Sequence, residues 1–314
     1  MVRKHTRRAA KAAFAISFGV ALLLGLAACG GGGGGKQTTS TQAAAKPKVI
    51  VGSKNFTEEF ILGQLYAQAL KAKGFPVELK SNIGSSEIID TSITSNKINF
   101  YPEYTGVIVL VLAKQKSPKS AAATYAAAKK FEETRGLTLL EPTPFYDSDT
   151  ASVLKSTAQK HGLKTIEDLK KLGSFSYAGY PECNKRITCL LGLKRIYGLT
   201  KVRFIQIGTI SVETLLDQHK ADAGDIFSTE PALATGKYTP LTDTKHIFGF
   251  QNVAPVVSQK LLKGSNGRLL ASICNKVSSK LTIDAMIAMN KAVGVDKKAP
   301  SAVAKAFLEA NGLL

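Results

Sequence analysis

The sequence predicts an α/β fold in which the chain forms two lobes, the first of them discontinuous. From Lys48 onward, short β-branched or apolar runs alternate with segments of helical periodicity. Such alternation is typical of sheets covered by helices. Two strand-like segments, near Asp149 and near Gln251, interrupt the alternation and are interpreted as crossings between lobes. We therefore expect lobe 1 to comprise residues 48–148 and 252–314, and lobe 2 to comprise residues 149–251.

The stretch Val49–Gln68 organises the first lobe. Val49 to Val51 is a β-branched run that favours a buried strand, and the helical spacing of apolar residues after it predicts a helix. Asn55 is expected to cap this helix, with Glu58 returning the hydrogen bond. The turn at 53–57 carries Lys54 and free backbone N–H groups, a combination that favours an anion. The alternative is an ordinary strand–helix corner with an exposed lysine.

Two further expectations concern local structure in the first lobe. The run Ile98–Tyr101 predicts a strand that Pro102 breaks. The segment Ser85–Ser95 predicts a helix whose inward face holds Ile88, Ile89 and Ile93.

The N-terminus has the features of a processing signal rather than of a folded element. A basic segment is followed by an apolar run from Ala12 to Ala28, which ends in Leu26-Ala27-Ala28-Cys29 and resembles a bacterial lipobox. We expect residues 1–28 to be a lipoprotein signal peptide and Cys29 to carry the lipid. Residues 29–47, rich in glycine and polar residues, are expected to be a flexible tether. The alternatives are an uncleaved membrane anchor and a plain secretory signal.

The chain is basic, with a formal charge of +19, and residues 1–28 hold five basic residues and no acid. A basic protein raises the possibility of nucleic-acid binding. Export argues against that class, and so does the scatter of the lysines, which form no dense block. We expect no nucleic-acid partner, and interpret most of the charge as solvated surface that suits a location near anionic lipid.

The remaining cysteines suggest one disulfide. Cys183 and Cys189 lie in a short loop of an exported protein, and a local disulfide is the natural interpretation. A zinc site would need two more ligands, and no histidine is near in sequence, so no metal is expected. Cys274 lies in an apolar helical segment and is expected to be a buried free thiol.

Five motifs occur in order along the chain and carry a family resemblance. Together they resemble the substrate-binding proteins of ABC importers for glycine betaine, choline, carnitine and related osmoprotectants, over about residues 48–314. The motifs are Ser-Lys-Asn-Phe-Thr-Glu (53–58), Ile-Asn-Phe-Tyr-Pro-Glu-Tyr-Thr-Gly (98–106), Lys-Thr-Ile-Glu-Asp-Leu (164–169), Asp-Ile-Phe-Ser-Thr-Glu (225–230) and Ala-Pro-Val-Val (254–257).

The resemblance implies a two-lobed type II periplasmic-binding-protein fold that closes on its ligand. It implies an extracytoplasmic protein, anchored by its lipid to the outer face of the cell membrane. Such a protein delivers a betaine-like solute to the permease and ATPase subunits of an importer. It implies no catalytic residue and no cofactor. The hinge is expected near residues 147–150 and 250–253.

The resemblance also implies site residues. A quaternary ammonium has no N–H to donate and is held by aromatic faces, whereas a carboxylate needs positive donors. By motif match, the resemblance implies that Lys54 and Arg186 hold the carboxylate. Tyr104 is a ring of the cage, and Phe227 replaces another tyrosine of the family, keeping the ring without the hydroxyl.

Other positions depart from the family pattern. Ala151 and Gln251 stand where tyrosines are expected, and Val107 stands where a threonine often contributes a hydroxyl. We therefore expect a cage reduced to two of four rings and a weaker hold on a trimethylammonium. The alternative is a pocket for another small zwitterion, such as a polar amino acid, with Asp149, Gln251 and Glu230 supplying hydrogen bonds.

Two other classes of function were considered. No Ser/His/Asp arrangement is evident, and His161, His219 and His246 lie outside any recognisable nucleophile or metal motif, so an enzyme is not expected. A structural or adhesive lipoprotein that merely keeps the fold would bind no small solute.

Overall fold

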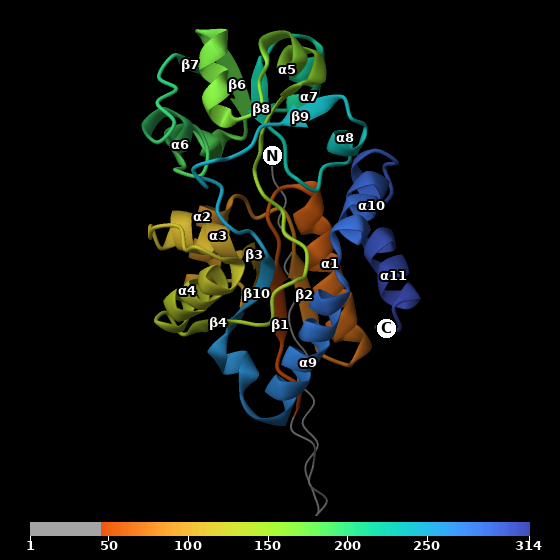
Figure 1. The fold of residues 1–314 in the computed structure, drawn as a ribbon. Helices are drawn as coiled ribbons and strands as arrows, with labels where there is room; N and C mark the ends of the chain where they lie inside the picture. Colours follow the sequence, from red (N-terminus) through yellow and green to blue (C-terminus); the bar gives the residue numbers. More distant parts are fainter. Residues whose placement is uncertain (1–44) are drawn as a thin grey trace, which may run out of the picture. The chain divides into compact units, whose positions relative to one another are not determined.

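The computed structural model describes residues 45–314, which form two five-stranded sheets (Figure 1). The first sheet has the order β2-β1-β3-β10-β4, and the second has the order β7-β6-β8-β5-β9. The strands are β1 (Val49–Gly52), β2 (Val77–Lys80), β3 (Phe100–Tyr104), β4 (Leu137–Leu139), β5 (Ala151–Leu154), β6 (Phe175–Gly179), β7 (Val202–Gln206), β8 (Ala223–Asp225), β9 (Tyr238–Pro240) and β10 (Val253–Ser258). The predicted signal peptide, the lipidated Cys29 and most of the predicted tether lie outside the described residues.

The two sheets share one plan. In the first, β1 is parallel to β2 and β3, while β10 is antiparallel to β3 and β4. In the second, β6 is parallel to β7 and β8, while β5 is antiparallel to β8 and β9. The antiparallel strand in the fourth position of each sheet, β10 or β5, is the first strand after the chain has crossed from the other sheet. We call the elements around the first sheet the first lobe, and those around the second sheet the second lobe.

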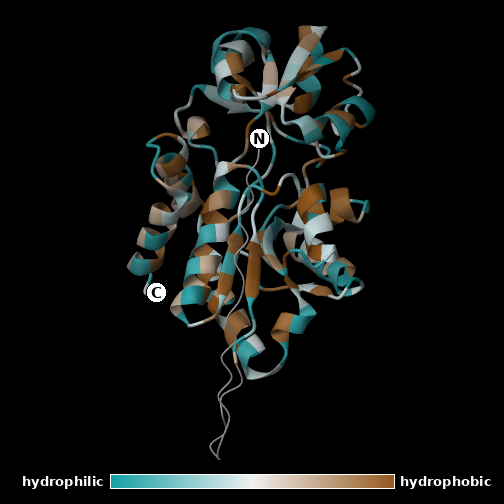
Figure 2. Ribbon diagram, turned by 180° about the vertical axis from the view of Figure 1, so that it is seen from behind, coloured by the Kyte–Doolittle hydropathy of each residue, from teal (hydrophilic) through white to brown (hydrophobic). Residues whose placement is uncertain are grey.

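Helices cover both faces of each sheet. Successive residues of a strand point to opposite faces, and the central strands carry apolar residues on both. Val253 and Val257 of β10 pack with the long helices on one face, whereas Ala254 and Val256 pack with those on the other. Figure 2 shows the resulting hydrophobic strands at the centre of the first sheet. The first-lobe helices are α1 (Thr57–Ala72), α2 (Ser86–Thr94), α3 (Thr105–Val107) with a π-helical continuation (Ile108–Leu112), α4 (Ala121–Glu133), α9 (Gly264–Lys280), α10 (Ile283–Gly294) and α11 (Pro300–Ala310).

The second lobe uses shorter helices around the same kind of core. One face of its sheet packs on Leu190 and Leu193 of α6, and the other packs on Leu215 and Leu216 of α7. These elements are α5 (Lys155–His161), α6 (Leu190–Arg195), α7 (Val212–Asp217) and α8 (Pro231–Ala234), with 3₁₀ turns at Ile166–Leu172 and Pro181–Lys185. A further 3₁₀ turn, Gln259–Leu262, follows β10. Within residues 45–314, no helix is both long and apolar enough to cross a membrane.

The two connections between the sheets run side by side. Tyr146 and Asn252 form an isolated antiparallel bridge, and the backbone N–H of Asp147 donates to the carbonyl of Gln251 at 3.1 Å. The segments expected to act as a hinge thus lie next to one another. Since these connections feed β5 and β10, the residues just before both strands lie where the lobes meet.

Three local predictions were wrong. β3 continues through Pro102, which lies opposite Pro255 of β10. Proline has no N–H to donate, so the two prolines lie opposite each other at a non-hydrogen-bonded position of the antiparallel ladder. α1 begins at Thr57 after Phe56, and no side chain caps it. Asn55 is therefore not the cap. Ile88 is 54% exposed, while its neighbour Ile89 is buried.

Candidate functional site

A cavity of about 40 Å³ lies between the lobes, at the ends of strands from both sheets. Lys54 follows β1, Tyr104 ends β3, and Phe227 lies just beyond β8. Asp149 and Gln251 precede β5 and β10. All six residues predicted for the ligand site line this cavity: Lys54, Tyr104, Asp149, Arg186, Phe227 and Gln251.

Four aromatic rings line the cavity, not two. The Phe227 ring lies 5.4 Å from the Phe56 ring and 5.6 Å from the Tyr180 ring, measured between centroids, and Phe56 lies 6.3 Å from Tyr104. The rings therefore form a continuous row. Phe56 belongs to the first motif, but neither it nor Tyr180 was predicted as a cage ring. Tyr180 directly follows β6, and its place at a strand end is the signal that could have identified it.

Ala151 and Gln251, which stand where the family pattern has tyrosines, supply no ligand-binding ring here. Ala151 is fully buried inside β5, opposite Asp225, and does not line the cavity. Gln251 does line it, but its side-chain oxygen accepts from the Val107 N–H at 3.1 Å and its amide donates to the Phe248 carbonyl at 2.7 Å. Gln251 therefore fixes the backbone around the cavity.

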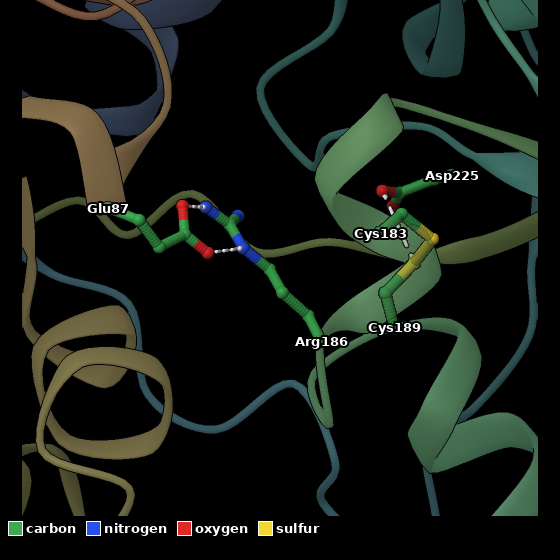
Figure 3. Close-up of a disulfide and its surroundings, with 5 residues drawn as sticks. All are labelled: Glu87, Cys183, Arg186, Cys189 and Asp225. Carbon is green, nitrogen blue, oxygen red and sulfur yellow. Dashed lines mark hydrogen bonds and ion pairs between the residues drawn. A yellow bond between two sulfur atoms is a disulfide. The ribbon is translucent and has the colours of Figure 1, made fainter.

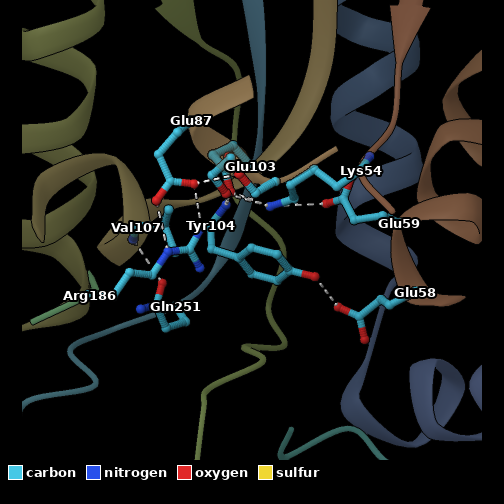
Figure 4. Close-up of polar contacts among 11 residues, drawn as sticks. Lys54, Glu58, Glu59, Glu87, Glu103, Tyr104, Val107, Arg186 and Gln251 are labelled. Carbon is cyan, nitrogen blue, oxygen red and sulfur yellow. Dashed lines mark hydrogen bonds and ion pairs between the residues drawn. The ribbon is translucent and has the colours of Figure 1, made fainter. Parts of the chain in front are cut away.

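Lys54 is 2% exposed and lies within a buried ionic cluster (Figure 4). Its ammonium forms an ion pair with Glu103, lies 3.5 Å from Glu59 Oε1 and lies 4.2 Å from the centroid of the Tyr104 ring. The Lys54 backbone N–H donates to Glu59 at 3.2 Å. Burial raises the pKa of Glu59 to about 8, against the opposing effect of Lys54. The expected free anion site in this turn is thus largely occupied by the protein's own carboxylates.

Tyr104 is fixed through its hydroxyl, which donates to Glu58 Oε1 at 2.8 Å. The other oxygen of Glu58 accepts from the Thr229 hydroxyl at 2.7 Å and from the Asn290 amide at 3.0 Å. Burial raises the pKa of Glu58. Glu58, expected to complete a helix cap, instead joins a cage ring of the first lobe to the second lobe.

Arg186 bridges the lobes from the opposite side of the cavity. Its Nε and Nη2 donate to the two oxygens of Glu87 at 3.0 and 2.8 Å (Figure 3). Although burial disfavours the ionised form, hydrogen bonds from Arg186 lower the pKa of Glu87 to about 2, so this pair stays ionised. The bidentate geometry is the form in which guanidinium and carboxylate interact most strongly.

Arg186 lies in the loop that the disulfide closes. Cys183 and Cys189 are joined by a disulfide, both are buried, and their Cα atoms lie 5.1 Å apart. Cys274 is a buried free cysteine.

Removing the disulfide in the double variant Cys183→Ser/Cys189→Ser is expected to lower the free energy of unfolding by about 2 kcal/mol, because the unfolded chain regains loop entropy. Urea unfolding of wild type and variant measures this. Reductant should destabilise only the wild type, and equal stability of the two proteins would contradict the prediction.

The lining of the cavity is rich in acids. Burial and the nearby Glu58 raise the pKa of Asp147 well above its usual range, although the Thr229 N–H donates to it at 3.1 Å. Burial raises the pKa of Asp149 to about 6, while Arg186 opposes that shift. Glu182 also lines the cavity. A lining of this kind favours a ligand with positive charge.

A second, more open cavity of about 890 Å³ adjoins the first and shares four lining residues with it: Asn55, Phe56, Tyr180 and Phe227. Its wall also includes Glu230, whose pKa burial raises to about 7. Three rings of the row, Phe56, Tyr180 and Phe227, line both cavities.

Two α/β lobes joined by paired connections, with a small ring-lined cavity between strand ends, define a solute-binding protein of the periplasmic-binding-protein type. The chain belongs to the OpuAC family, the substrate-binding domains of ABC-type glycine betaine transport systems, which match residues 47–310. This confirms the resemblance carried by the five motifs.

Individual relatives agree with this assignment. The chain is 28% identical to the glycine-betaine-binding protein of Pseudomonas aeruginosa over 276 residues, which cover 84% of this chain and 88% of the relative. It is 27% identical to the glycine betaine-binding protein YehZ of Escherichia coli, covering 86% and 92%. A solved structure of a glycine betaine/carnitine/choline ABC transporter superposes with a TM-score of 0.68 at 23% identity, covering 84% of this chain and 99% of the other. The predicted two-lobed α/β fold is confirmed.

Proposed function

We propose that this protein captures a small quaternary ammonium solute of the glycine betaine type and delivers it to the permease and ATPase subunits of an ABC importer. The observation that carries the proposal is the row of four rings along the cavity between the lobes: Phe56, Tyr104, Tyr180 and Phe227. Aromatic faces attract a cation that has no hydrogen to donate, each by roughly 0.5–2 kcal/mol. The family to which the chain belongs supports the same role.

The proposed roles of the other residues follow from their contacts. Lys54 already pairs with Glu59 and Glu103, so its contribution to a ligand is mainly to orient the Tyr104 ring. Arg186 uses two of its five N–H groups on Glu87 and can offer others to the ligand's polar end. Asp149 faces the same end of the cavity and adds negative charge.

Closure of the lobes is proposed to accompany binding, with the paired segments near residues 147–150 and 250–253 as the hinge. Two contacts that link the lobes, Arg186 with Glu87 and Thr229 with Glu58, would favour the closed arrangement. Cys29 is proposed as the lipid anchor on the sequence Leu26–Cys29 alone, which places the protein at the outer face of the cell membrane.

Isothermal titration of the purified protein tests the proposed ligand class. We expect glycine betaine, choline or carnitine to bind with a dissociation constant on the order of micromolar. A neutral carbon isostere of choline, 3,3-dimethylbutan-1-ol, should bind at least about 10-fold more weakly, because it fills the same volume without a charge. Tighter binding of glutamine than of every quaternary ammonium would overturn the proposal and favour a polar amino acid.

The alternative ligand, a polar amino acid, loses its main support in this geometry. It depended on Ala151 and Gln251, but Ala151 does not line the cavity and the polar atoms of Gln251 are engaged by backbone groups.

A further inference from the structure

Asp225, the last residue of β8, is a buried carboxyl group whose hydrogen-bonding neighbour is another carboxyl, that of Asp149. It is 4% exposed, and its Oδ1 has no partner among the described residues. Its Oδ2 lies 3.7 Å from the sulfur of Cys189 (Figure 3). That sulfur belongs to a disulfide and has no proton to donate. A buried carboxyl in this position must either hold a proton itself or meet a donor from outside the protein.

The carboxyl lies next to the ligand cavity. A small cavity of about 20 Å³, enough for roughly one water-sized group, is lined by Asp225, Asp149 and the disulfide. Its other lining residues, Tyr180, Glu182, Arg186 and Phe227, also line the ligand cavity. The small cavity is therefore an extension of the ligand site at the end of the ring row.

The extension is surrounded by more carboxyl groups than unpaired cations. Its two neighbouring cations, Lys54 and Arg186, are already paired with Glu59, Glu103 and Glu87. The carboxyls of Asp225, Asp149, Asp147 and Glu182 then remain without a cation partner among the described residues. When these carboxyls are ionised, a ligand carboxylate placed here would add to an excess of negative charge.

We propose that Asp225, together with Asp149, forms an acceptor subsite that determines specificity: it binds the hydrogen-bond-donating end of a cationic ligand and disfavours a carboxylate there. The inference rests on the proposed function and narrows it. The preferred ligand is a quaternary ammonium that carries a hydroxyl or N–H group at a short distance, as choline does. A zwitterion such as glycine betaine binds less tightly.

The subsite should make the affinity for each ligand depend on pH. Burial raises the pKa of Asp149 to about 6, and burial followed by the charge of Asp149 raises the pKa of Asp225. Protonation at low pH supplies O–H donors that tolerate a ligand carboxylate, whereas ionisation at higher pH favours a cation. Affinity for choline should therefore rise from pH 5.5 to pH 8, and affinity for glycine betaine should fall. The charged or titratable groups that face the pair are Lys54, Asp147, Tyr177, Glu182 and Arg186.

The test titrates choline and glycine betaine, which keep their own charges over this range, into wild type, Asp225→Asn and Asp284→Asn at both pH values. Asp284 is exposed in the first turn of α10, so its variant changes the net charge equally. We expect the wild type to prefer choline. Asp225→Asn should weaken choline binding about 10- to 100-fold and spare glycine betaine. Asp284→Asn should change neither.

The outcomes separate the two proposals. If the wild type prefers glycine betaine and Asp225→Asn leaves the ratio of affinities unchanged, the subsite is refuted while the proposed function stands. If no quaternary ammonium binds the wild type, both are refuted. Thermal unfolding verifies that the variant is folded. Asp149→Asn is the second variant, and it should lower the choline preference and flatten its pH dependence if the pair acts together.

Discussion

Replacing Lys54 by methionine is expected to lower the free energy of unfolding by about 3–5 kcal/mol near neutral pH. The substitution keeps most of the side-chain volume and removes the ammonium. Glu103, which is fully buried and ion-paired with Lys54, then loses its cation. A buried carboxylate without a partner is costly. Removing one member of a buried ion pair therefore destabilises a protein more than replacing both members by apolar residues.

The control is Lys48→Met. Lys48 is exposed and pairs with Glu78 at 2.7 Å across the edge of the first sheet, so its loss should cost no more than about 1 kcal/mol. Urea unfolding followed by circular dichroism measures both variants. A Lys54→Met protein within about 1 kcal/mol of wild type would contradict the prediction, because it would show that Glu103 does not depend on Lys54 for its stability in the folded protein.

The sign of the pH dependence follows from the same cluster. Burial raises the pKa of Glu59 to about 8 in the folded protein, above its ordinary value of 4.5. The folded state therefore binds this proton more tightly than the unfolded state does. Protonated Glu59 contributes to the free energy of unfolding in full below pH 4.5, and that contribution is lost as the pH rises toward 8. Without Lys54 the carboxyls hold protons more tightly still. The defect of Lys54→Met should accordingly be smallest near pH 5 and grow toward pH 8.

The sequence was most informative where local patterns alone decide structure. Three features predicted the sheets and the positions just outside the strand ends: the β-branched run at 49–51, the five motifs and the two crossing strands. Those positions supplied five of the six predicted cavity residues, and the sixth, Arg186, lies in the loop between Cys183 and Cys189. The polar sequence of α5 (Lys155–His161) has no apolar periodicity, and this helix was not predicted.

Long-range contacts were the main source of error. Asn55 and Glu58 match a capping pattern, but Tyr104, Thr229 and Asn290 compete for the Glu58 carboxylate and prevail. The closer partner of Lys54, Glu103, lies 49 residues away on β3, so the residues around Lys54 could not reveal this ion pair. Counting rings by motif position found two, whereas Phe56 and Tyr180 enter the cavity because of where β1 and β6 end.

Phe227 lies between Phe56 and Tyr180 in the ring row, and its removal should have the largest effect on binding of any single ring. In Phe227→Ala we expect affinity for the preferred quaternary ammonium to fall about 10- to 100-fold, or about 1.4–2.8 kcal/mol. The ring is only partly exposed and stacks at 5.6 Å on Tyr180, so its loss also leaves that neighbour without support. Isothermal titration measures the change.

Two further substitutions separate the contribution of the π face from that of apolar volume. Phe227→Leu keeps an apolar side chain without a π face, and it should lose most of the affinity for the cation while binding the neutral isostere as the wild type does. Phe227→Tyr keeps the face, restores the residue expected from the family pattern, and should bind the cation at least as well as wild type. If Phe227→Leu held the cation as tightly as phenylalanine does, the attraction would be apolar contact rather than cation–π. The four rings would then be a hydrophobic wall, and the negative charge of the surrounding carboxyls alone would select the cation.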